Sequence, residues 1–173
     1  MDYIYKDGTM IVKNVTSLDL GETLDCGQSF RWRDNGDGSF TGVAYEKLVT
    51  VSIRDKDLHI ENTTEQDFEK IWRNYFDLDL DYDSIRSSIG EIHPVLKEAS
   101  AYAPGIRILR QEPWEALCTF IISQNNNIKR IKGIVDRLCT TFGNKIGDTD
   151  FYTFPTAENL AKLTPDDLAP LRA

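Results

Sequence analysis

Residues 120–131 read FIISQNNNIKRI, in which three consecutive asparagines separate two apolar runs. Asparagine competes with its own backbone for hydrogen bonds and therefore favours helix caps and turns over helix interiors. The stretch predicts two helices joined by an amide-rich turn, with Lys129 and Arg130 in the first turn of the second helix.

Apolar spacing predicts the helices on either side of this turn. The first opens at Pro113, because proline suits the first helical position. Its apolar stripe comprises Trp114, Leu117, Cys118, Ile121 and Ile122. The stripe of the second helix comprises Ile128, Ile131, Val135, Leu138 and Phe142, with Arg130 and Arg137 pointing away from it. Two shorter helices are predicted over residues 156–162 and 164–171.

In the N-terminal part of the chain, the spacing of apolar residues is that of strands instead of helices. Segments 28–33 and 39–45 flank Asn35-Gly36-Asp37-Gly38, whose glycines suit a tight reversal. Around residues 49–53 apolar and polar side chains alternate, which is typical of a strand buried on one face. Residues 10–62 therefore predict an antiparallel meander.

Helical periodicity returns after residue 62. Either Thr63 or Thr64 can cap a helix whose apolar stripe is Phe68, Ile71, Trp72 and Tyr75. Shorter helices are predicted over residues 82–88 and 94–102. Because Ala103-Pro104-Gly105 is typical of a boundary, we expect two domains, residues 1–103 and 104–173.

The charge balance limits the kinds of partner. The 173 residues include 20 Lys and Arg against 28 Asp and Glu, a net charge of −8. This excludes a protein that coats nucleic acid by bulk charge. Residues 61–100 hold ten acidic and four basic residues, whereas residues 125–140 hold four basic residues and one acidic residue. The overall charge therefore does not exclude a local basic site within residues 125–140.

Conventional catalytic and metal-binding patterns are not found. The three cysteines are widely spaced, and His59 and His93 lack the neighbours of a catalytic triad. The acidic pairs at residues 77–83 lack a calcium-loop spacing and predict a solvated acidic face. No segment has the length of a signal peptide core or a membrane span. We expect a reduced, soluble, cytoplasmic protein.

The amide turn by itself has two interpretations. Short amide side chains beside cations, at a helix N-terminus that offers free N–H groups, suit a phosphate or nucleic acid. An asparagine-rich cap with a solvated basic face fits the same residues. A second segment, Asp25-Cys26-Gly27-Gln28-Ser29-Phe30-Arg31-Trp32-Arg33, places a glycine just before an aromatic and basic strand.

Together these segments resemble a known family. Residues 27–32 (GQSFRW), 109–113 (LRQEP) and 123–131 (SQNNNIKRI) carry the resemblance, with Phe154-Pro155 in a matching place. The chain resembles the N-terminal part of an 8-oxoguanine DNA glycosylase/lyase of the helix-hairpin-helix superfamily, over essentially its whole length.

The resemblance implies an α+β fold and roles for four residues. A twisted antiparallel sheet similar to the TATA-binding-protein fold would precede the first helices of an all-α glycosylase domain. Asn125 would fill the space left by the extruded base, Asn126 would bind DNA beside it, and Arg130 would hold the orphaned cytosine. The backbone carbonyl of Gly27 would read the damaged base. The implied partner is double-stranded DNA containing oxidised guanine, at the nucleoid in a prokaryote, with no cofactor.

The sequence departs from the family at the catalytic residues. The family uses a lysine in a helix-hairpin-helix and a later aspartate, and Gly147 is the last glycine here. We therefore expect no catalytic residue in this chain, a truncated glycosylase domain and a missing C-terminal helical domain as its partner. The alternatives are a non-catalytic module for damaged or distorted duplex and an acidic interaction domain using residues 61–100.

An uncovered apolar surface is expected near the last helices. Leu160, Leu163, Leu168 and Leu171 would lie on faces that nothing in the chain is left to cover.

Overall fold

The computed structural model describes residues 1–171, so the last two residues of the predicted second domain lie outside the described residues. The strands are β1 (Tyr3–Lys6), β2 (Thr9–Val12), β3 (Trp32–Asp34), β4 (Ser39–Ala44), β5 (Lys47–Arg54) and β6 (Asp57–Glu61). Contacts divide the chain into two units. The first comprises residues 1–28, 34–41 and 49–110, and the second comprises 29–33, 42–48 and the described residues from 111 on.

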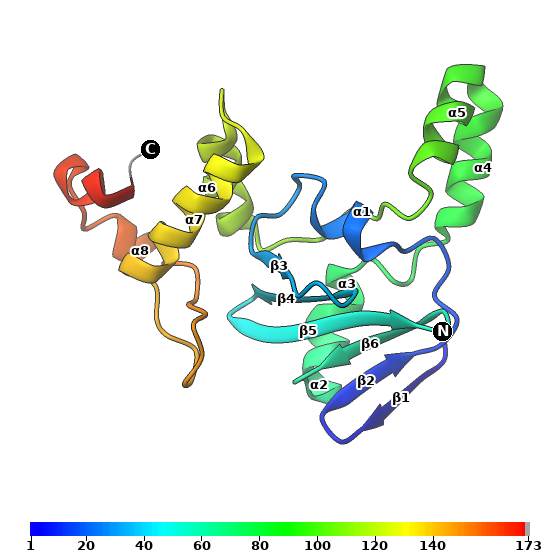
Figure 1. Cartoon of the computed structure of the whole chain (residues 1–173), viewed down its shortest axis with the longest axis horizontal. Helices are drawn as coiled ribbons and strands as arrows, with labels where there is room; N and C mark the ends of the chain where they lie inside the picture. The colour runs from blue at the N-terminus through cyan, green and yellow to red at the C-terminus, as the bar shows by residue number, and fades with distance from the viewer. Residues whose placement is uncertain (172–173) are drawn as a thin grey trace. The chain divides into compact units, whose positions relative to one another are not determined.

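The strands of the described residues form one sheet in the order β1-β2-β6-β5-β4-β3 (Figure 1). Strands β3 to β6 form the meander that the turn residues predict, and the hairpin β1–β2 is added at β6. Three hairpins turn through two residues with positive φ: Asp7-Gly8, Tyr45-Glu46 and Asp55-Lys56. Such turns match the right-handed twist of the flanking strands. The α+β class and the antiparallel sheet are confirmed.

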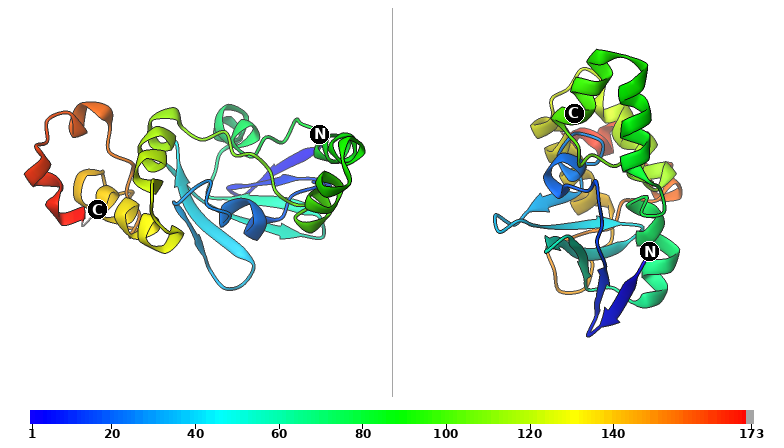
Figure 2. Two further views of the ribbon diagram at one scale, coloured as in Figure 1. Left: turned by 90° about the horizontal axis from the view of Figure 1, so that it is seen from above. Right: turned by 90° about the vertical axis from the view of Figure 1, so that its right-hand side faces the viewer.

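One face of the first unit's strands carries its core. The register pairs Met10 with Ile60 and Ile60 with Val51, which places these side chains on the same face, and all three are fully buried. A helix running from residue 65 to residue 75 covers this face (Figures 1 and 2). It comprises α2 (Glu65–Asp67), a π-helical turn η1 (Phe68–Trp72) and α3 (Arg73–Tyr75).

The π-helical turn corrects the predicted apolar stripe of this helix. Thr64 caps it, since its hydroxyl accepts a hydrogen bond from the N–H of Asp67 at 3.0 Å. Phe68, Trp72 and Phe76 follow at intervals of four residues and are fully buried. Because hydrogen bonds in a π-turn span five residues instead of four, the turn is wider and Ile71 is displaced to a half-buried position.

A helical hairpin follows in the first unit. It consists of α4 (Tyr82–Ile92), longer than predicted, and α5 (Pro94–Tyr102), as predicted (Figure 1). His93 caps α5, because its Nδ1 accepts from the N–H of Val95 at 3.2 Å. Among residues 1–171 no helix combines the length and the apolar character needed to cross a membrane.

Residues 105–110 have no regular secondary structure, yet they pack tightly against α1 (Leu20–Leu24) and its neighbours. The Gly105 carbonyl accepts from the N–H of Asp19 and from the hydroxyl of Thr23, both at 2.9 Å. A Cβ on Gly105 would lie 2.3 Å from the Cβ of Asp19, so only glycine fits. Contacts therefore place residues 104–110 with the first unit. The division at residues 103/104 remains a proposal about domains.

Arg107 ties this segment to three others. Its guanidinium donates to the carbonyls of Thr16 (2.7 Å), Ser17 (3.0 Å) and Asp77 (2.8 Å). It also lies over the ring of Tyr82, 4.5 Å from the ring centre. The residue is buried, so these carbonyls replace the water that a guanidinium would otherwise bind.

The second unit has its own core. It contains α6 (Pro113–Ser123), α7 (Ile128–Phe142), α8 (Ala157–Leu160) and a 3₁₀ helix η2 (Pro165–Leu171). The buried core residues are Phe30, Ile131, Ile134, Val135, Leu138, Cys139, Phe154 and Leu171. The predicted inner face of α7 is confirmed for Ile131, Val135 and Leu138. The prediction was wrong for Ile128, which is exposed at the start of α7.

The predicted stripe of α6 is also partly wrong. Trp114, Cys118 and Ile122 pack on the core, as expected. Leu117 and Ile121 instead face solvent, together with Phe120, which is 65% exposed. The fully inward positions belong to Glu115 and Thr119, which are buried.

The apolar surface expected near the chain's last helices is not where it was predicted. Leu171 is buried in the core of the second unit, and Leu160 packs partly buried on the same core. The carbonyl of Leu171 also accepts two hydrogen bonds from Arg137, at 2.9 and 2.6 Å. Of the four predicted leucines, Leu168 alone is classed as exposed. The chain covers most of this region with its own residues.

We expect Arg107→Lys to lower the free energy of unfolding by at least about 2 kcal/mol, because one ammonium group cannot serve three carbonyls arranged around a planar fork. Urea denaturation measures this. The control is Arg54→Lys, at an exposed arginine paired with Glu61 at 2.7 Å, for which a change within about 0.5 kcal/mol is expected. Equal effects of the two substitutions would contradict the role given to Arg107.

Candidate functional site

Gly27 lies in the loop that follows α1 in the first unit. Its φ is +89°, in the left-handed region where a side chain is strained, and the residue is half-buried. The loop geometry therefore favours glycine here, and the residue that carries this carbonyl has no Cβ. Gly27 belongs to the first unit and the other predicted site residues to the second.

The amide turn between α6 and α7 forms as predicted. Asn127 caps α7, since its side-chain oxygen accepts from the N–H of Arg130 at 3.0 Å. The Asn126 side-chain nitrogen donates to the carbonyl of Ile122 at 3.3 Å, and Asn126 is half-buried. Asn125 adopts φ +53°, a conformation that asparagine tolerates better than most residues, and is exposed. Two asparagines thus build the turn, and the third projects from it.

Asn125 and Arg130 are the residues of this turn whose side chains are available to bind a ligand. Both are exposed, and within residues 1–171 neither side chain makes a hydrogen bond or ion pair. Lys129 is exposed beside them. The other two predicted basic residues are used differently, since Lys132 lines a pocket and Arg137 binds the carbonyl of Leu171. The exposed positive charge at the turn is therefore that of Lys129 and Arg130.

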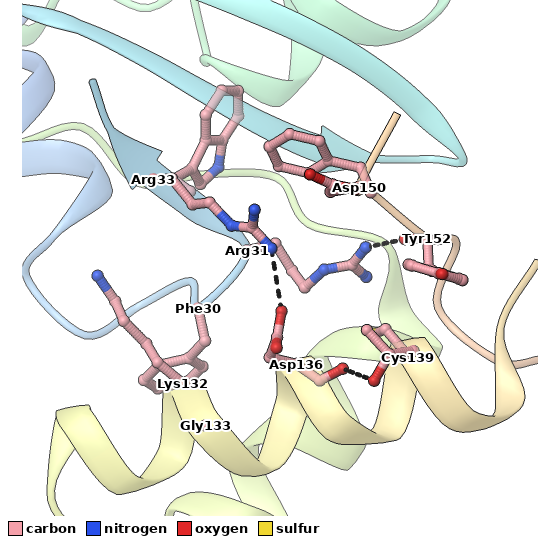
Figure 3. A pocket seen from close by; sticks show the side chains of 12 residues that line it. Phe30, Arg31, Arg33, Lys132, Gly133, Asp136, Cys139, Asp150 and Tyr152 are labelled. Carbon is pink, nitrogen blue, oxygen red and sulfur yellow. Dashed lines mark hydrogen bonds and ion pairs between the residues drawn. The ribbon is translucent and has the colours of Figure 1, made fainter. Parts of the chain in front are cut away.

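A cavity of about 360 Å³ lies within the second unit, between residues 30–33, α7 and residues 150–152 (Figure 3). Arg33 crosses it, 4.4 Å from the ring centre of Phe151, and donates to Asp136 at 3.1 Å. Arg31 donates to the carbonyl of Tyr152 and lies 3.4 Å from the carboxylate of Glu115. The two arginines of this cavity are thus paired within the chain.

Burial dominates the electrostatics of this region. It raises the pKa of Glu115 to about 7, against the opposing effect of the Arg31 charge. It also raises the pKa of the Cys139 thiol to about 12, which keeps that sulfur protonated and unreactive. Sequence reasoning missed the Arg31 and Glu115 pair, because an acidic residue in a helix's first turn usually serves the helix dipole at the surface.

No metal centre is formed by the part of the chain that the structure describes: no three His, Cys, Asp or Glu side chains gather closely enough. His59 is half-buried on β6, and His93 serves as a helix cap.

Known proteins resemble this chain over most of its length. The family described as "8-oxoguanine DNA glycosylase, N-terminal domain" matches residues 10–117. A relative from Saccharomyces cerevisiae named N-glycosylase/DNA lyase is 34% identical over 173 residues, covering 90% of this chain and 45% of the relative. This chain therefore spans less than half the length of that relative.

Two solved structures match nearly the whole chain. The first, "Structure of MBOgg1 in complex with low affinity DNA ligand", has a TM-score of 0.94 and 44% identity, covering 99% of this chain and 61% of that one. The second is the Clostridium acetobutylicum 8-oxoguanine glycosylase/lyase in complex with double-stranded DNA containing cytosine opposite 8-oxoguanine. Its TM-score is 0.93 at 36% identity, covering 99% of this chain and 59% of that one.

The raised pKa of Glu115 makes stability depend on pH. An unfolded glutamate ionises near pH 4.3. The folded residue keeps its proton up to about pH 7. Its contribution to the free energy of unfolding is therefore complete below about pH 4.5 and is lost as the pH rises through about 7. Glu115→Gln stays neutral at every pH. We expect the free energy of unfolding of the wild type, relative to this variant, to fall by about 2 to 3 kcal/mol between pH 5 and pH 8.

Urea denaturation of both proteins at the two pH values checks this expectation. Glu65→Gln, at an exposed position of α2, is the control and should show no such difference. If the free energies of unfolding of wild type and Glu115→Gln differ by the same amount at pH 5 and pH 8, Arg31 keeps the carboxylate ionised at both pH values.

Proposed function

The chain belongs to the 8-oxoguanine DNA glycosylase N-terminal domain family, and from that membership we propose that it is the N-terminal part of a bifunctional DNA glycosylase/AP lyase. In this proposal it recognises 8-oxoguanine opposite cytosine in double-stranded DNA, turns the base out of the helix and serves base excision repair inside the cell. The observation that carries the proposal is the amide turn, where Asn125 and Arg130 are exposed with unused hydrogen-bonding groups.

Base flipping requires the features of this turn. An enzyme that acts on a base must extrude it, and the remaining gap must be filled while the stranded cytosine keeps hydrogen-bond partners. Asn125 is short, polar and projects from a fixed turn, which suits the gap. Arg130, in the first turn of α7, offers several donors to the acceptor edge of cytosine. Asn126 completes the proposed DNA contact at the base of the turn.

Gly27 is proposed to read the lesion. 8-Oxoguanine carries a hydrogen at N7, whereas guanine has an acceptor there. A fixed backbone carbonyl therefore accepts from the lesion and repels the normal base, and leaving a buried polar group unpaired costs about 1 to 3 kcal/mol. Because Gly27 has no Cβ, its carbonyl can approach the base closely.

The proposed chemistry needs an amine that attacks C1′ of the damaged nucleotide, releases the base and forms a Schiff base from which the strand is cleaved. Lys129, Lys145 and Lys162 are exposed and lack the desolvated setting that activates an amine, and Lys132, which lines the cavity, is only half-buried. We therefore assign the nucleophile to a C-terminal helical part of the same protein. The exposed Leu117, Phe120 and Ile121 on α6 support such a part, because apolar surface of this kind is normally covered.

Arg130→Ala tests the cytosine contact. In the full protein we expect binding to fall by about 1 to 3 kcal/mol when cytosine lies opposite the lesion, and less with the other three bases, because a bidentate contact is base-specific. Lys129→Ala, at the neighbouring exposed cation, should weaken binding equally for all four opposite bases. Titration of labelled duplexes measures both variants. A uniform loss with Arg130→Ala would reduce this residue to a phosphate contact.

Borohydride trapping tests the assignment of the nucleophile. The reagent reduces a Schiff base to a stable protein–DNA adduct. The 173-residue chain taken alone should give no adduct with an 8-oxoguanine duplex and release no base, and any DNA binding by it should be weak and salt-sensitive. An adduct would mean that one of its own lysines is the nucleophile. Base-independent binding by the full protein would favour a non-catalytic module for distorted duplex.

A further inference from the structure

We infer that Gln28 is a positioning residue that fixes the direction of the Gly27 carbonyl, and so determines how well the protein distinguishes 8-oxoguanine from guanine. The inference rests on the lesion-reading role proposed for Gly27. It comes from three hydrogen bonds of the Gln28 side chain whose partners lie within the first unit.

The Gln28 amide is held at both of its ends. Its nitrogen donates to the carbonyl of Thr23 and to the carbonyl of Arg107, both at 2.8 Å. Its oxygen accepts from the N–H of Leu109 at 3.0 Å. Both N–H donors and one oxygen lone pair are therefore used, and the plane of the amide is fixed by three bonds in different directions.

The three partners are themselves rigidly placed. Thr23 is fully buried on α1, and its hydroxyl donates to the Gly105 carbonyl at 2.9 Å and accepts from the N–H of Arg107 at 3.2 Å. Arg107 is anchored by its guanidinium to three main-chain carbonyls, and Leu109 is 5% exposed. Gln28 is thus attached to a buried frame and not to a mobile surface.

The clamp acts on the peptide bond that carries the Gly27 carbonyl. This bond is planar, so its direction is set by the rotations on either side of it, at Gly27 and at Gln28. Glycine restrains its own backbone less than any other residue does. The restraint must therefore come from Gln28, whose side chain ties its Cα to Thr23, Arg107 and Leu109.

Few residue types could replace Gln28. Asparagine is one methylene shorter and cannot span from the loop to both carbonyls. Glutamate has the right length, but it would present a second oxygen to the carbonyls of Thr23 and Arg107 in place of two donors. Both changes leave the loop sequence otherwise intact, and each loosens the carbonyl of Gly27 by a different route.

The test measures discrimination and not affinity alone. Wild type, Gln28→Ala, Gln28→Glu and Gln28→Asn of the full protein are titrated with duplexes that carry 8-oxoguanine, guanine or an abasic-site analogue opposite cytosine. A 2′-fluorine on the target sugar slows loss of the base during the titration. Gln66→Ala, at an exposed glutamine of α2, is the matched control.

We expect the Gln28 variants to lose roughly fivefold or more of the ratio of affinities for the 8-oxoguanine and guanine duplexes. Affinity for the abasic-site duplex, which has no base to read, should stay within about twofold of wild type. Gln66→Ala should leave all three affinities unchanged. If Gln28→Ala does not fold, as judged by urea denaturation, the milder Gln28→Asn is compared with wild type in the same way.

Two other outcomes would overturn the inference. An unchanged ratio in a folded Gln28 variant would show that the carbonyl of Gly27 needs no clamp. A parallel loss of affinity for all three duplexes would make Gln28 a purely structural residue. A wild-type protein that does not prefer 8-oxoguanine over guanine would instead refute the proposed function itself, whatever the variants do.

Discussion

The first unit depends on the requirement that every buried main-chain polar group find a partner. Residues 105–110 have neither a helix nor a strand ladder to supply those partners. Side chains supply them instead: the Thr23 hydroxyl, the Gln28 amide and the Tyr82 hydroxyl each bind a main-chain group of this segment. Arg107, a residue of this segment, in turn donates hydrogen bonds from its guanidinium to three carbonyls of other loops. One irregular segment therefore holds α1 and the Gly27 loop in place.

In the second unit, helix α6 buries polar side chains and exposes apolar ones. Glu115 and Thr119 face inward on α6, while Leu117, Phe120 and Ile121 face outward. A buried carboxyl is costly unless a partner compensates, and Arg31 lies 3.4 Å away to do so. The Thr119 hydroxyl donates to the carbonyl of Glu115 at 2.9 Å, within the helix itself. The polar groups on the inner side are thus satisfied, and the outer side of α6 exposes apolar side chains.

Elements with strong local signals could be predicted from the sequence. The reversal at residues 35–38, the strand around Val51 and the asparagine turn before Ile128 are short-range features, and the structure confirms each of them. Errors arose where tertiary packing overrides local pattern. Periodicity shows that α6 has an apolar stripe, but it does not show which side of that stripe meets the core, and the π-turn at residues 68–72 changes the period itself. The Gln28 clamp joins residues about 80 positions apart, and no local pattern signals it.

The charge of the chain constrains how its proposed DNA site can work. At a net charge of −8, long-range attraction to phosphates must come from local clusters. Two of the four basic residues near the amide turn do not project freely into solvent, since Lys132 lines the cavity and Arg137 binds Leu171. With Lys129 and Arg130 as the exposed cations at the turn, few phosphates can be neutralised. Affinity must then come mainly from hydrogen bonds and shape at an opened base pair, which favours a duplex that is already easy to distort.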